Sequence, residues 1–416
     1  MKILVVGSGG RESAIVWKLR QSEKVSKIYC APGNGSMAES ISISAKDIDG
    51  LLNFALTEKI DLTIVGTEEP LEMGIVDAFN EKGLKIFGPS QKAAIIECSK
   101  EFSKDFMVRN NIPTAKHQSF DDKNEALYYI EKNGLPTVIK ADGLSVGKGV
   151  YICNTIYDAD EALNEIMVQE KYGKAGKKVV VEEFLEGTEV SILSFTDGRS
   201  IVPMVSSKDH KHAYDGNKGP NTGGMGTVAP NNAYDEQTAK YCMEEIFKPT
   251  VNALAKEGRE FKGIIFFGLM LTKDGPKLLE YNARFGDPEA QVVLPLLENN
   301  LLDILLACCD GSLDKINIEW KKKAAVCLVL ASEGYPGKYE TGFEIQGIEK
   351  FTNENEAIVF GAGVKKDGNK LLTSGGRIIG VTALADTVKE AADKAYEYAE
   401  KIKFDNKTFR RDIGRI

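Results

Sequence analysis

The sequence lacks the marks of several large protein classes. No apolar run approaches the length of a membrane-spanning helix, so we expect no transmembrane segment. The net charge of −8 argues against a general binder of nucleic acid or of anionic membranes. If the substrates are phosphates, the positive charge that binds them must therefore be concentrated locally. The chain also has no internal repeat and no low-complexity segment.

Cysteine and histidine are too sparse, or too poorly spaced, for disulfides or zinc. The seven cysteines, including adjacent Cys308 and Cys309, form no CxxC pair, which predicts reduced, buried thiols. Of the three histidines, His210 and His212 are two positions apart without a third ligand nearby, which argues against a zinc site. The chain opens with a short apolar strand and glycines, too short for a signal peptide, so we expect a cytoplasmic protein.

The chain is nevertheless long and contains regular secondary-structure signals. Its 416 residues are enough for roughly three domains, each with its own core. In the N-terminal part, short apolar strands alternate with helical segments, which predicts a parallel sheet with helices on both faces. The expected strands are Lys2–Val6, Lys27–Cys30, Ile60–Val65 and Leu84–Phe87.

The middle of the chain has the signals of an antiparallel sheet. Asp197-Gly198 and Asp274-Gly275 stand where two-residue hairpin turns belong. Between them, Lys208–Gly226 contains five glycines and little apolar content, which is typical of a long binding loop or lid. The expected strands are Lys178–Leu185, Glu189–Thr196, Ile201–Val205 and Ile264–Thr272.

The remaining elements are two helices, Tyr234–Gly258 and Leu301–Cys309, and a small C-terminal unit. Tyr234–Gly258 is predicted to be a helix that Pro249 kinks or restarts. A new α+β domain is expected to begin near Trp320, and its last helix opens at Thr387 with the spacing of a capping box. The strands expected in this domain are Ala324–Ala331, Glu356–Val364 and Ile378–Ala383.

The first strand ends in a glycine turn, Gly7–Glu12, that leads into a helix. Backbone N–H groups at such a helix start bind anions, and Gly9, Gly10 and Arg11 are predicted to hold a single phosphate. A dinucleotide is disfavoured, because Glu12 replaces the third glycine of its fingerprint and no acidic residue ends the second strand. A turn required only for packing remains an equally common alternative.

A second glycine-rich segment, Gly143–Gly149, lies between two apolar strands within Pro136–Tyr151. Glycines let backbone N–H groups crowd an anion, and Lys148 and the strand-end Lys140 add positive charge. A Walker A loop is excluded, because Gly rather than Ser or Thr follows the lysine and a strand comes next. We predict a hairpin that closes over phosphates, and a plain glycine hairpin is the less favoured alternative.

The segment Lys277–Gln291 combines a polar strand face with an acidic turn. Alternating polarity places two sets on opposite faces: Glu280, Asn282 and Arg284, and, toward the core, Leu279, Tyr281 and Ala283. A carboxylate beside a carboxamide offers hard oxygens to Mg²⁺, and the arginine fork suits phosphate or carboxylate. The turn then presents Asp287 and Glu289 nearby. A strand with a solvated charged face is about as common.

The predicted helix Ser99–Asn111 contains one lysine that belongs to no apolar stripe. Ser99 is a good N-cap, and Phe102 and Phe106 share one face. Lys104 lies off that face, and taken alone it would be a solvated lysine.

With these residues placed, the chain resembles the phosphoribosylamine–glycine ligase family, or glycinamide ribonucleotide synthetases, of the ATP-grasp superfamily. The resemblance spans the chain and rests on GSGGRE, KADGLSVGKGV, VEEFLEG, DHKHAYDGNKGPNTGGMG and RFGDPEAQ. It implies an N-terminal Rossmann-like domain (1–100), an ATP-grasp domain with a central antiparallel sheet (101–320) containing a mobile lid at about 115–187, and a C-terminal domain (321–416).

The resemblance also implies a reaction and its ligands. Glycine and 5-phosphoribosylamine would be joined with ATP to give glycinamide ribonucleotide, ADP and phosphate through a glycyl phosphate, an early step of purine biosynthesis. The implied cofactors are ATP and Mg²⁺ or Mn²⁺. The partners would be these small molecules, with no nucleic acid and no membrane, and we expect a monomer or a weak dimer.

Family residues are carried over only to matching positions. Those matching ATP-binding residues are Lys104, Lys140, Gly143, Gly147, Lys148, Gly149, Glu182, Leu185 and Glu189. Those matching substrate-binding residues are Gly9, Gly10, Arg11, Asp209, Gly223 and Gly224. Glu280 and Asn282 match metal ligands, and Arg284 and Asp287 match catalytic positions. The chain departs from the family at Ser13, where His is usual, and at His212, where Arg is common.

Three other functions remain open from the sequence. Another ATP-grasp carboxylate–amine ligase would share the grasp residues, and only the RFGDPE and NTGGMG stretches discriminate against it. A nicotinamide-dependent oxidoreductase built on the first domain is opposed by Glu12 and the missing ribose acid. A non-catalytic nucleotide-binding regulator is opposed by the intact Glu280, Asn282 and Arg284.

Overall fold

The N-terminal part is a parallel sheet, as predicted. The computed structural model describes residues 1–37, 39–144, 149–348 and 357–415. The strand order is β2 (Lys27–Pro32), β1 (Lys2–Gly7), β3 (Leu62–Val65) and β4 (Ile86–Phe87). The helices of this part are α1 (Gly10–Leu19), α2 (Ile48–Glu58), α3 (Glu68–Glu72), α4 (Ile75–Glu81) and α5 (Gln91–Cys98).

The alternation of side chains along β1 explains why this sheet has helices on both faces. Ile3 and Val5 pack into one apolar core with α1, whereas Leu4 and Val6 pack into a second core with α2 and α4. Because β2 and β3 flank β1 on opposite sides, the loops after β1 and β3 diverge and leave a crevice at their carboxyl ends. The glycine turn Gly7–Glu12, after β1, and Glu68, which begins α3 after β3, lie at this end of the sheet.

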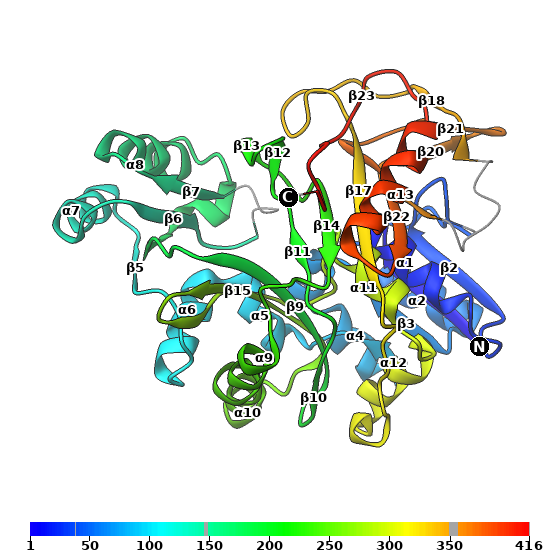
Figure 1. The fold of residues 1–416 in the computed structure, drawn as a ribbon. Coiled ribbons are helices and arrows are strands. Elements are labelled where there is room, and N and C mark those ends of the chain that lie inside the picture. Colours follow the sequence, from blue (N-terminus) through cyan, green and yellow to red (C-terminus); the bar gives the residue numbers. More distant parts are fainter. Residues whose placement is uncertain (38, 145–148, 349–356, 416) are drawn as a thin grey trace.

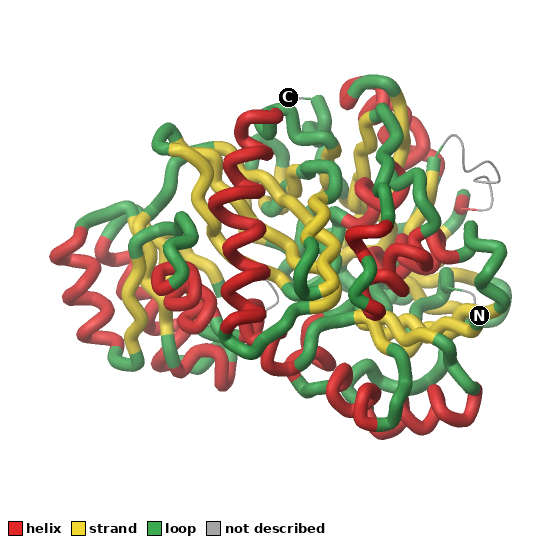
Figure 2. Tube along the Cα trace, turned by 90° about the horizontal axis from the view of Figure 1, so that it is seen from below, coloured by secondary structure: helices red, strands yellow, loops and turns green. Residues whose placement is uncertain are grey.

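A small antiparallel sheet projects from the body of the molecule, at the left in Figure 1 and again in Figure 2. Its strand order is β5 (His117–Phe120), β8 (Val179–Glu183), β6 (Thr137–Ala141) and β7 (Val150–Cys153). The strands β6 and β7 form the hairpin predicted on either side of the second glycine-rich segment. The helical segments are α7 (Lys123–Asn133), α8 (Ile156–Leu163), a π-helix (Asn164–Val168) and a 3₁₀ turn (Gly173–Lys177).

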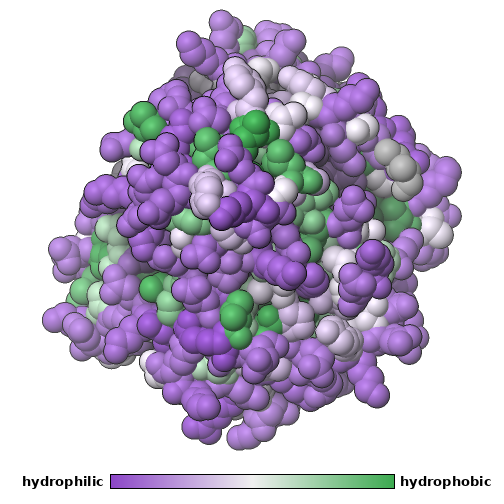
Figure 3. Space-filling model, turned by 90° about the vertical axis from the view of Figure 1, so that its left-hand side faces the viewer, coloured by the Kyte–Doolittle hydropathy of each residue, from purple (hydrophilic) through white to green (hydrophobic). Residues whose placement is uncertain are grey.

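The outer face of this projecting unit is mostly hydrophilic in Figure 3, with small separate apolar patches. Its exposed large apolar side chains are Tyr128, Leu135, Ile152, Ile156, Tyr157 and Val168. Its interior is a separate small apolar core that includes Ile130, Ile139 and Val181. The unit therefore has a core of its own, as a lid needs if it is to move as a body.

The central sheet is antiparallel, as predicted. Its order is β10 (Ile201–Pro203), β9 (Thr188–Asp197), β15 (Lys262–Thr272) and β16 (Gly275–Asn282). The β15–β16 hairpin turns at Lys273 and Asp274, one residue earlier than predicted, because Thr272 pairs with Gly275. One face of this sheet carries an aromatic core with edge-on and tilted ring contacts among Phe106, Phe247, Phe267 and Tyr281.

The helices around the central sheet follow their local signals. The side chain of Ser99 caps α6 (Lys100–Arg109) by accepting from the Phe102 backbone N–H. The predicted helix Tyr234–Gly258 is α9 (Glu236–Cys242), a π turn (Met243–Phe247) and α10 (Lys248–Lys256), with Pro249 in the first turn of α10. Other helices are α11 (Ala290–Leu296), α12 (Leu301–Asp310) and a 3₁₀ turn (Leu313–Lys315).

The predicted alternation in β16 is wrong at one residue. The register with β15 shifts between Gly268 and Leu269, so that Gly268 faces Glu280 and Leu269 faces Leu278. Leu279 is the extra residue of this β-bulge and is only half-buried, whereas Leu278 is fully buried in its place. Beyond the bulge, Tyr281 and Ala283 reach the core as expected.

The segment Lys208–Gly226 is not the irregular loop that its composition predicts. It holds β11 (Lys208–Asp209) and the hairpin of β12 (His212–Tyr214) with β13 (Lys218–Asn221). It leads into β14 (Gly226–Ala229), which pairs with β17 (Ala324–Ser332) of the C-terminal part. The glycines permit tight turns here, but long-range pairing decides that the backbone is extended.

The C-terminal part is an α+β unit, as predicted, but its sheet is shared with the middle of the chain. The order is β11, β14, β17, β22 (Arg377–Ala385) and β19 (Ile358–Gly361), and β23 (Lys407–Thr408) also pairs with β17. A second sheet contains β18 (Glu344–Ile345), β21 (Lys370–Thr373) and β20 (Val364–Asp367). Helix α13 (Val388–Lys401) begins with the predicted capping box of Thr387 and Glu390.

Candidate functional site

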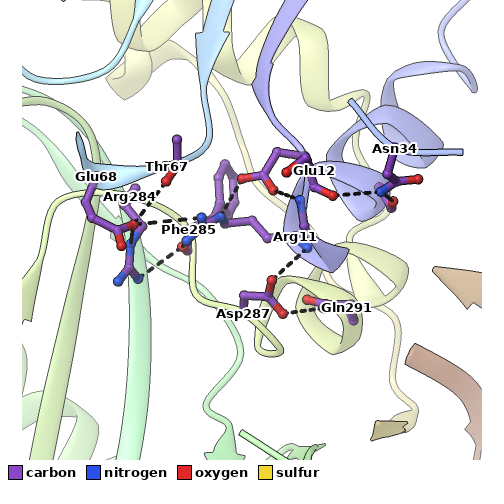
Figure 4. A network of polar contacts seen from close by, with 12 residues as sticks. Arg11, Glu12, Asn34, Thr67, Glu68, Arg284, Phe285, Asp287 and Gln291 are labelled. Atoms are coloured by element: carbon purple, nitrogen blue, oxygen red, sulfur yellow. Dashed lines mark hydrogen bonds and ion pairs between the residues drawn. The ribbon is translucent and has the colours of Figure 1, made fainter. Parts of the chain in front are cut away.

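Three distant parts of the sequence meet at the crevice of the N-terminal sheet. The backbone N–H of Arg11 lies 3.4 Å from Oδ2 of Asp287, and Nη1 of Arg11 donates to the carbonyl oxygen of Phe285 at 3.0 Å (Figure 4). Nε of Arg11 donates to Glu12 at 2.7 Å. The predicted phosphate turn and the acidic turn after β16 are thus side by side.

Gly9 and Gly10 are required for this close approach. A Cβ at Gly9 would lie 2.8 Å from Oδ2 of Asp287, and one at Gly10 would lie 2.4 Å from Nε2 of Gln291. The packing role that the sequence left open is therefore real. This packing role is compatible with phosphate binding, because Gly9 is the N-cap of α1 and backbone N–H groups at a helix start can bind an anion.

The Gly223–Gly224 segment reaches the same place from the shared sheet. At Gly224 the φ angle is 111°, and a Cβ there would lie 2.4 Å from Pro288 and 2.5 Å from Oδ1 of Asp209. Nη1 of Arg377 donates to the carbonyl oxygens of Gly223 (2.6 Å) and Asp287 (2.8 Å). Gly9, Gly10, Arg11, Asp209, Gly223, Gly224 and Asp287 therefore form one cluster.

The surroundings of Asp209 in this cluster disfavour its charged form. Its Oδ1 is buried without a hydrogen-bond partner among the described residues. Burial first, and then the charge of Glu289, raise the pKa of Asp209 well above its usual value. Burial also raises the pKa of Glu289, whose exposed fraction is 5%. The pair is an acidic pocket that favours either a retained proton or a cationic ligand group.

Arg284 is held by carboxylates that the sequence did not single out. Its Nη2 lies 2.8 Å from Oε1 of Glu97. Its Nε lies 3.3 Å from Oε2 of Glu68 (Figure 4). Burial acts to raise the pKa of Glu68, but the charges of Arg284 and Arg11 outweigh it and lower the value to about 2. Glu68 is therefore ionised, and the guanidinium is oriented by the fold.

Glu280 and Asn282 lie on the same face of β16 as Arg284, as predicted. Oδ1 of Asn282 accepts from Nη2 of Arg284 at 3.1 Å. Burial opposes ionisation of Glu280, but nearby positive charges, that of Lys211 above all, lower its pKa overall. The others are those of Lys140, Lys100 and Arg284. An ionised carboxylate in a cationic surround is suited to a ligand set of metal and phosphates.

The donor set fits a hard divalent cation that retains non-protein ligands. The described residues contain no group of three or more His, Cys, Asp or Glu side chains that would hold a metal alone. Glu280 and Asn282 supply one carboxylate and one amide oxygen, and Mg²⁺ commonly takes one or two protein ligands plus phosphates and water. A cation here would therefore depend on a bound nucleotide.

Lys104, Lys140 and Glu182 form a buried triad at the base of the projecting sheet. Nζ of Lys104 lies 2.8 Å from Oε2 of Glu182, and Nζ of Lys140 lies 2.9 Å from Oε1. Lys104 is 2% exposed, so its interpretation as a solvated lysine is wrong. Burial, the largest influence, lowers the pKa of Lys104 to about 8 although Glu182 acts in the opposite direction.

The other predicted nucleotide residues are more dispersed. Leu185 is half-buried just beyond β8, and Glu189 of β9 lies 3.4 Å from Nζ of Lys211. The carbonyl oxygen of Gly143 accepts from Nζ of Lys100 at 2.9 Å, and that of Gly149 accepts from the Ala141 backbone at 2.9 Å. Gly147 and Lys148 lie outside the described residues.

The two departures from the family pattern have separate surroundings. Oγ of Ser13 donates to the carbonyl oxygen of Gly361 at 2.5 Å, and Nδ2 of Asn34 donates to that same oxygen at 3.0 Å. Ser13 therefore links α1 to the C-terminal unit. Nδ1 of His212 lies 2.9 Å from the carbonyl oxygen of Gly219 within the β12–β13 hairpin.

Sequence reasoning missed several residues of the site: Glu68, Glu97, Lys100, Lys211, Gln291, Tyr335 and Arg377. Gln291 and Lys211 lie inside the family stretches, so they carried a signal. Glu97 and Arg377 carried none, because Glu97 meets the site across 186 residues of sequence and Arg377 meets it across 154 and 90.

A cavity of about 440 Å³ lies elsewhere, between β4 and α12. Its lining includes Lys85, Lys262 and Asp310 and none of the residues of the cluster described above. Lys85 is already paired with Asp310 at 2.6 Å. The chemistry of the candidate site is therefore concentrated in the cluster at the carboxyl ends of β1 and β3 and not in this hollow.

Sequence profiles of one family match almost the whole chain. They are described as the N domain (residues 1–97), the ATP-grasp (A) domain (98–290) and the C domain (325–416) of phosphoribosylglycinamide synthetase. The chain belongs to the phosphoribosylglycinamide synthetase family. The family membership predicted from the motifs is thus confirmed.

Relatives of this member of the phosphoribosylglycinamide synthetase family match the chain over its whole length. A phosphoribosylamine–glycine ligase of Caldanaerobacter subterraneus subsp. tengcongensis is 51% identical, covering 100% of this chain and 99% of the relative. The ligase of the same name from Clostridium acetobutylicum is 50% identical, with 100% of both chains covered. Such full-length similarity extends to every stretch that forms the site.

Solved structures confirm the predicted fold class. A crystal structure of phosphoribosylamine–glycine ligase from Thermotoga maritima has a TM-score of 0.85 and 33% identity, covering 99% of this chain and 100% of that one. The biotin carboxylase domain of a Hydrogenobacter thermophilus 2-oxoglutarate carboxylase has a TM-score of 0.73 at 16% identity, covering 98% and 91%. The second likeness shows a common fold alone.

No helix among the described residues has both the length and the apolar character needed to cross a membrane.

Proposed function

We propose that this chain joins glycine to 5-phosphoribosylamine with ATP, giving glycinamide ribonucleotide, ADP and phosphate in purine biosynthesis. The observation that carries the proposal is the convergence of Gly9–Arg11, Gly223–Gly224 and Asp287 in one crevice beside the cationic end of β16. Gly223–Gly224 and Asp287 belong to the NTGGMG and RFGDPE stretches, which discriminate against other ATP-grasp ligases, and relatives named phosphoribosylamine–glycine ligase match the chain from end to end.

The proposal assigns the nucleotide to the space between lid and central sheet. Lys104 and Lys140 would hold its phosphates, and the three donors of each ammonium allow a phosphate contact beside the ion pair with Glu182. Gly143, Gly147, Lys148 and Gly149 would close over the phosphates, Glu182 and Leu185 would meet the adenine, and Glu189 would accept from the ribose. Glu280 and Asn282 would hold Mg²⁺ or Mn²⁺, which when bound offsets phosphate charge.

The chemistry consists of two transfers that need no nucleophilic side chain. A carboxylate oxygen of glycine bonds to the γ-phosphorus, the β–γ bridging bond breaks, and ADP leaves. The phosphoribosylamine nitrogen then bonds to the acyl carbon, the C–O bond to phosphate breaks, and the nitrogen loses a proton. Arg284, oriented by Glu68 and Glu97, would stabilise charge on the transferring phosphoryl group.

The substrates would sit against the acidic pocket and the glycine turn. Gly9, Gly10 and Arg11 would bind the ribose phosphate of phosphoribosylamine. Asp209, Gly223, Gly224 and Asp287 would gather glycine and the attacking amine, both of which carry nitrogen that suits a carboxylate. Lid closure would exclude water, which otherwise hydrolyses an acyl phosphate.

The domain division belongs to the same proposal. We assign residues 1–100 to the phosphoribosylamine side, 101–320 to ATP-grasp with the lid at about 115–187, and 321–416 to the C-terminal domain. The separate lid core and the breaks between sheets support this division. The pairing of β14 with β17 means that the last two units share one sheet.

The decisive test is an assay of the purified chain with ATP, Mg²⁺, glycine and freshly generated phosphoribosylamine. We expect ADP and a product with the mass of glycinamide ribonucleotide only when all components are present, and none after chelation of the metal. An Arg284→Ala preparation made in parallel controls for host enzyme. Equal ADP release with alanine or serine in place of glycine would favour another ATP-grasp ligase and refute the proposal.

A further inference from the structure

The β12–β13 hairpin is fastened by two side chains from near the C-terminus. Arg410 donates from Nη1 to the carbonyl oxygen of His212 at 3.0 Å and from Nη2 to Oδ1 of Asn217 at 3.0 Å. Oδ2 of Asp412 accepts from the backbone N–H of Gly216 at 2.8 Å. Both the first strand of the hairpin and its turn are therefore held.

The fastening pair is itself rigid. Nε of Arg410 lies 2.8 Å from Oδ1 of Asp412, and Nη2 lies 2.7 Å from Oδ2, with side chains 1% and 13% exposed. A bidentate arginine–carboxylate pair permits essentially one geometry, and burial shields it from water. The neighbouring Arg411 differs, because its guanidinium is 54% exposed and pairs with Glu400. Of these two arginines, only Arg410 reaches the hairpin with its side chain, whereas Arg411 reaches Asp215 through its backbone N–H, which a substitution to alanine keeps.

The base of the hairpin lies at the candidate site. The backbone N–H and Oγ1 of Thr222 both donate to the carbonyl oxygen of Lys211 at 2.7 Å, which closes the base. Oγ1 of Thr222 also accepts from the backbone N–H of Gly224 at 3.0 Å. Gly224 in turn packs against Asp209 and Pro288. A displaced hairpin would therefore displace the Gly223–Gly224 turn.

We propose that Arg410 is a positioning residue, which fixes the β12–β13 hairpin and thereby holds the Gly223–Gly224 turn ready for glycine and the substrate amine. It touches no substrate and acts through the hairpin backbone. The identity of the substrates rests on the proposed function, whereas the fastening of the hairpin does not. The fit of Arg410 to both ends of the hairpin explains why a fully charged side chain is buried there.

Limited digestion with trypsin tests the fastening without any turnover. Lys218 lies in the hairpin and is exposed, so cleavage after it reports hairpin opening. We expect Arg410→Ala to raise the initial rate of this cleavage at least fivefold, as identified by peptide mass. Arg411→Ala is the matched control and should stay within twofold of the parent. Unchanged cleavage in Arg410→Ala would overturn the proposal.

A second variant guards against misfolding of the first. Asn217 is exposed and has a φ of 54°, so Asn217→Gly removes one acceptor of Arg410 without straining the backbone. We expect a smaller rise in cleavage, together with at least a threefold rise in KM for glycine and phosphoribosylamine. The value of kcat should change by less than twofold.

The kinetic pattern separates positioning from general destabilisation. Loss of folded enzyme lowers kcat and leaves KM unchanged, and that pattern in both variants would overturn the positioning role. Arg410→Lys keeps the charge but not the bidentate fork, so its KM for glycine should lie between that of Arg410→Ala and that of the parent. A parent protein with no glycine-dependent ADP release would refute the proposed function, while the digestion result would still decide whether Arg410 fastens the hairpin.

Discussion

At the scale of single residues, the site is defined by how its charges are balanced. Arg284 is flanked by Glu97 and Glu68, so its side chain is fixed and 15% exposed before any substrate binds. Lys104 and Lys140 share one buried carboxylate, Glu182. An anionic substrate therefore enters a field in which cations are already oriented, which is the arrangement that stabilises transferring phosphoryl groups.

Arg284→Ala should separate catalysis from nucleotide binding. We expect turnover to fall by about two to three orders of magnitude, while ATP affinity by calorimetry changes by less than threefold. Stability should also fall, because Glu97 would remain buried without its partner. The double variant Arg284→Met, Glu97→Gln should recover the melting temperature but not turnover. Turnover at the parent level in Arg284→Ala would contradict the assigned role.

Lys104 should make ATP binding sensitive to alkaline pH. Its pKa is lowered to about 8, so in the free protein the ammonium is lost as pH rises through that value. ATP affinity should be flat below pH 8 and then fall by up to about tenfold per unit. In Lys104→Arg the charge persists and the affinity measured from pH 7 to 9.5 should stay flat. A flat profile in the parent would contradict this prediction.

The same pKa shift has a stability counterpart. Between pH 8 and 10.5 the unfolded chain binds more protons at Lys104 than the folded chain does. The free energy of unfolding therefore increases as pH rises through that window, which means that this lysine destabilises the folded chain less at high pH.

At the scale of elements, close backbone contacts assemble the site. The bulge in β16 exchanges Leu279 for Leu278 in the core and keeps Glu280 on the polar face. The turn at Gly224 then packs directly on Pro288, which brings the shared sheet against the acidic turn. The contact at Gly224 leaves no room for a Cβ, so here the elements position the site by shape.

Gly224→Ala should therefore be far more harmful than alanine at a comparable glycine. A Cβ at Gly224 would overlap Pro288 and Asp209, so we expect a loss of about 3 kcal/mol or more in stability and near-complete loss of activity. Gly258 also has a positive φ, of 70°, but nothing lies within 4 Å of an added Cβ. Gly258→Ala should cost only about 1 kcal/mol. Equal melting temperatures for the two variants would show that the contact is unimportant.

At the scale of the whole molecule, the C-terminal unit completes a site that lies between the other parts. Arg377 of β22 bonds to Gly223 and Asp287, and the hydroxyl of Tyr335 accepts from the backbone N–H of Gly223 at 3.0 Å. The shared sheet places these residues, because β14 and β22 both pair with β17. The contacts around Gly223 and Asp287 therefore need the C-terminal unit in place.

Arg377→Ala should weaken binding of phosphoribosylamine more than binding of ATP. Without its guanidinium, the turn at Gly223 loses its link to Asp287, so we expect KM for phosphoribosylamine to rise at least tenfold. Calorimetric affinity for ATP should change by less than threefold. Lys370→Ala, at an exposed ion pair in the same unit, is the control. An equal loss of affinity for phosphoribosylamine and for ATP would point to general loss of structure.

Local rules predicted most of the secondary structure and part of the site. The N-caps Ser99 and Thr387 are where the sequence indicated, because capping depends on residues a few positions apart. The face shared by Glu280, Asn282 and Arg284 also followed from strand periodicity. The segment Lys208–Gly226 was misjudged, because its strands exist only through pairing with each other and with β17.

The sequence by itself determined the parallel and antiparallel sheets, the family and the group of residues around β16, since each depends on local periodicity or a contiguous motif. Only the tertiary structure decided which carboxylates orient Arg284, that Lys104 is buried, and that Arg377 and Arg410 hold the glycine-rich segment. The physical reason is that burial and charge pairing are properties of neighbours in space. Those neighbours are more than a hundred residues away in sequence for Arg284, Arg377 and Arg410 alike.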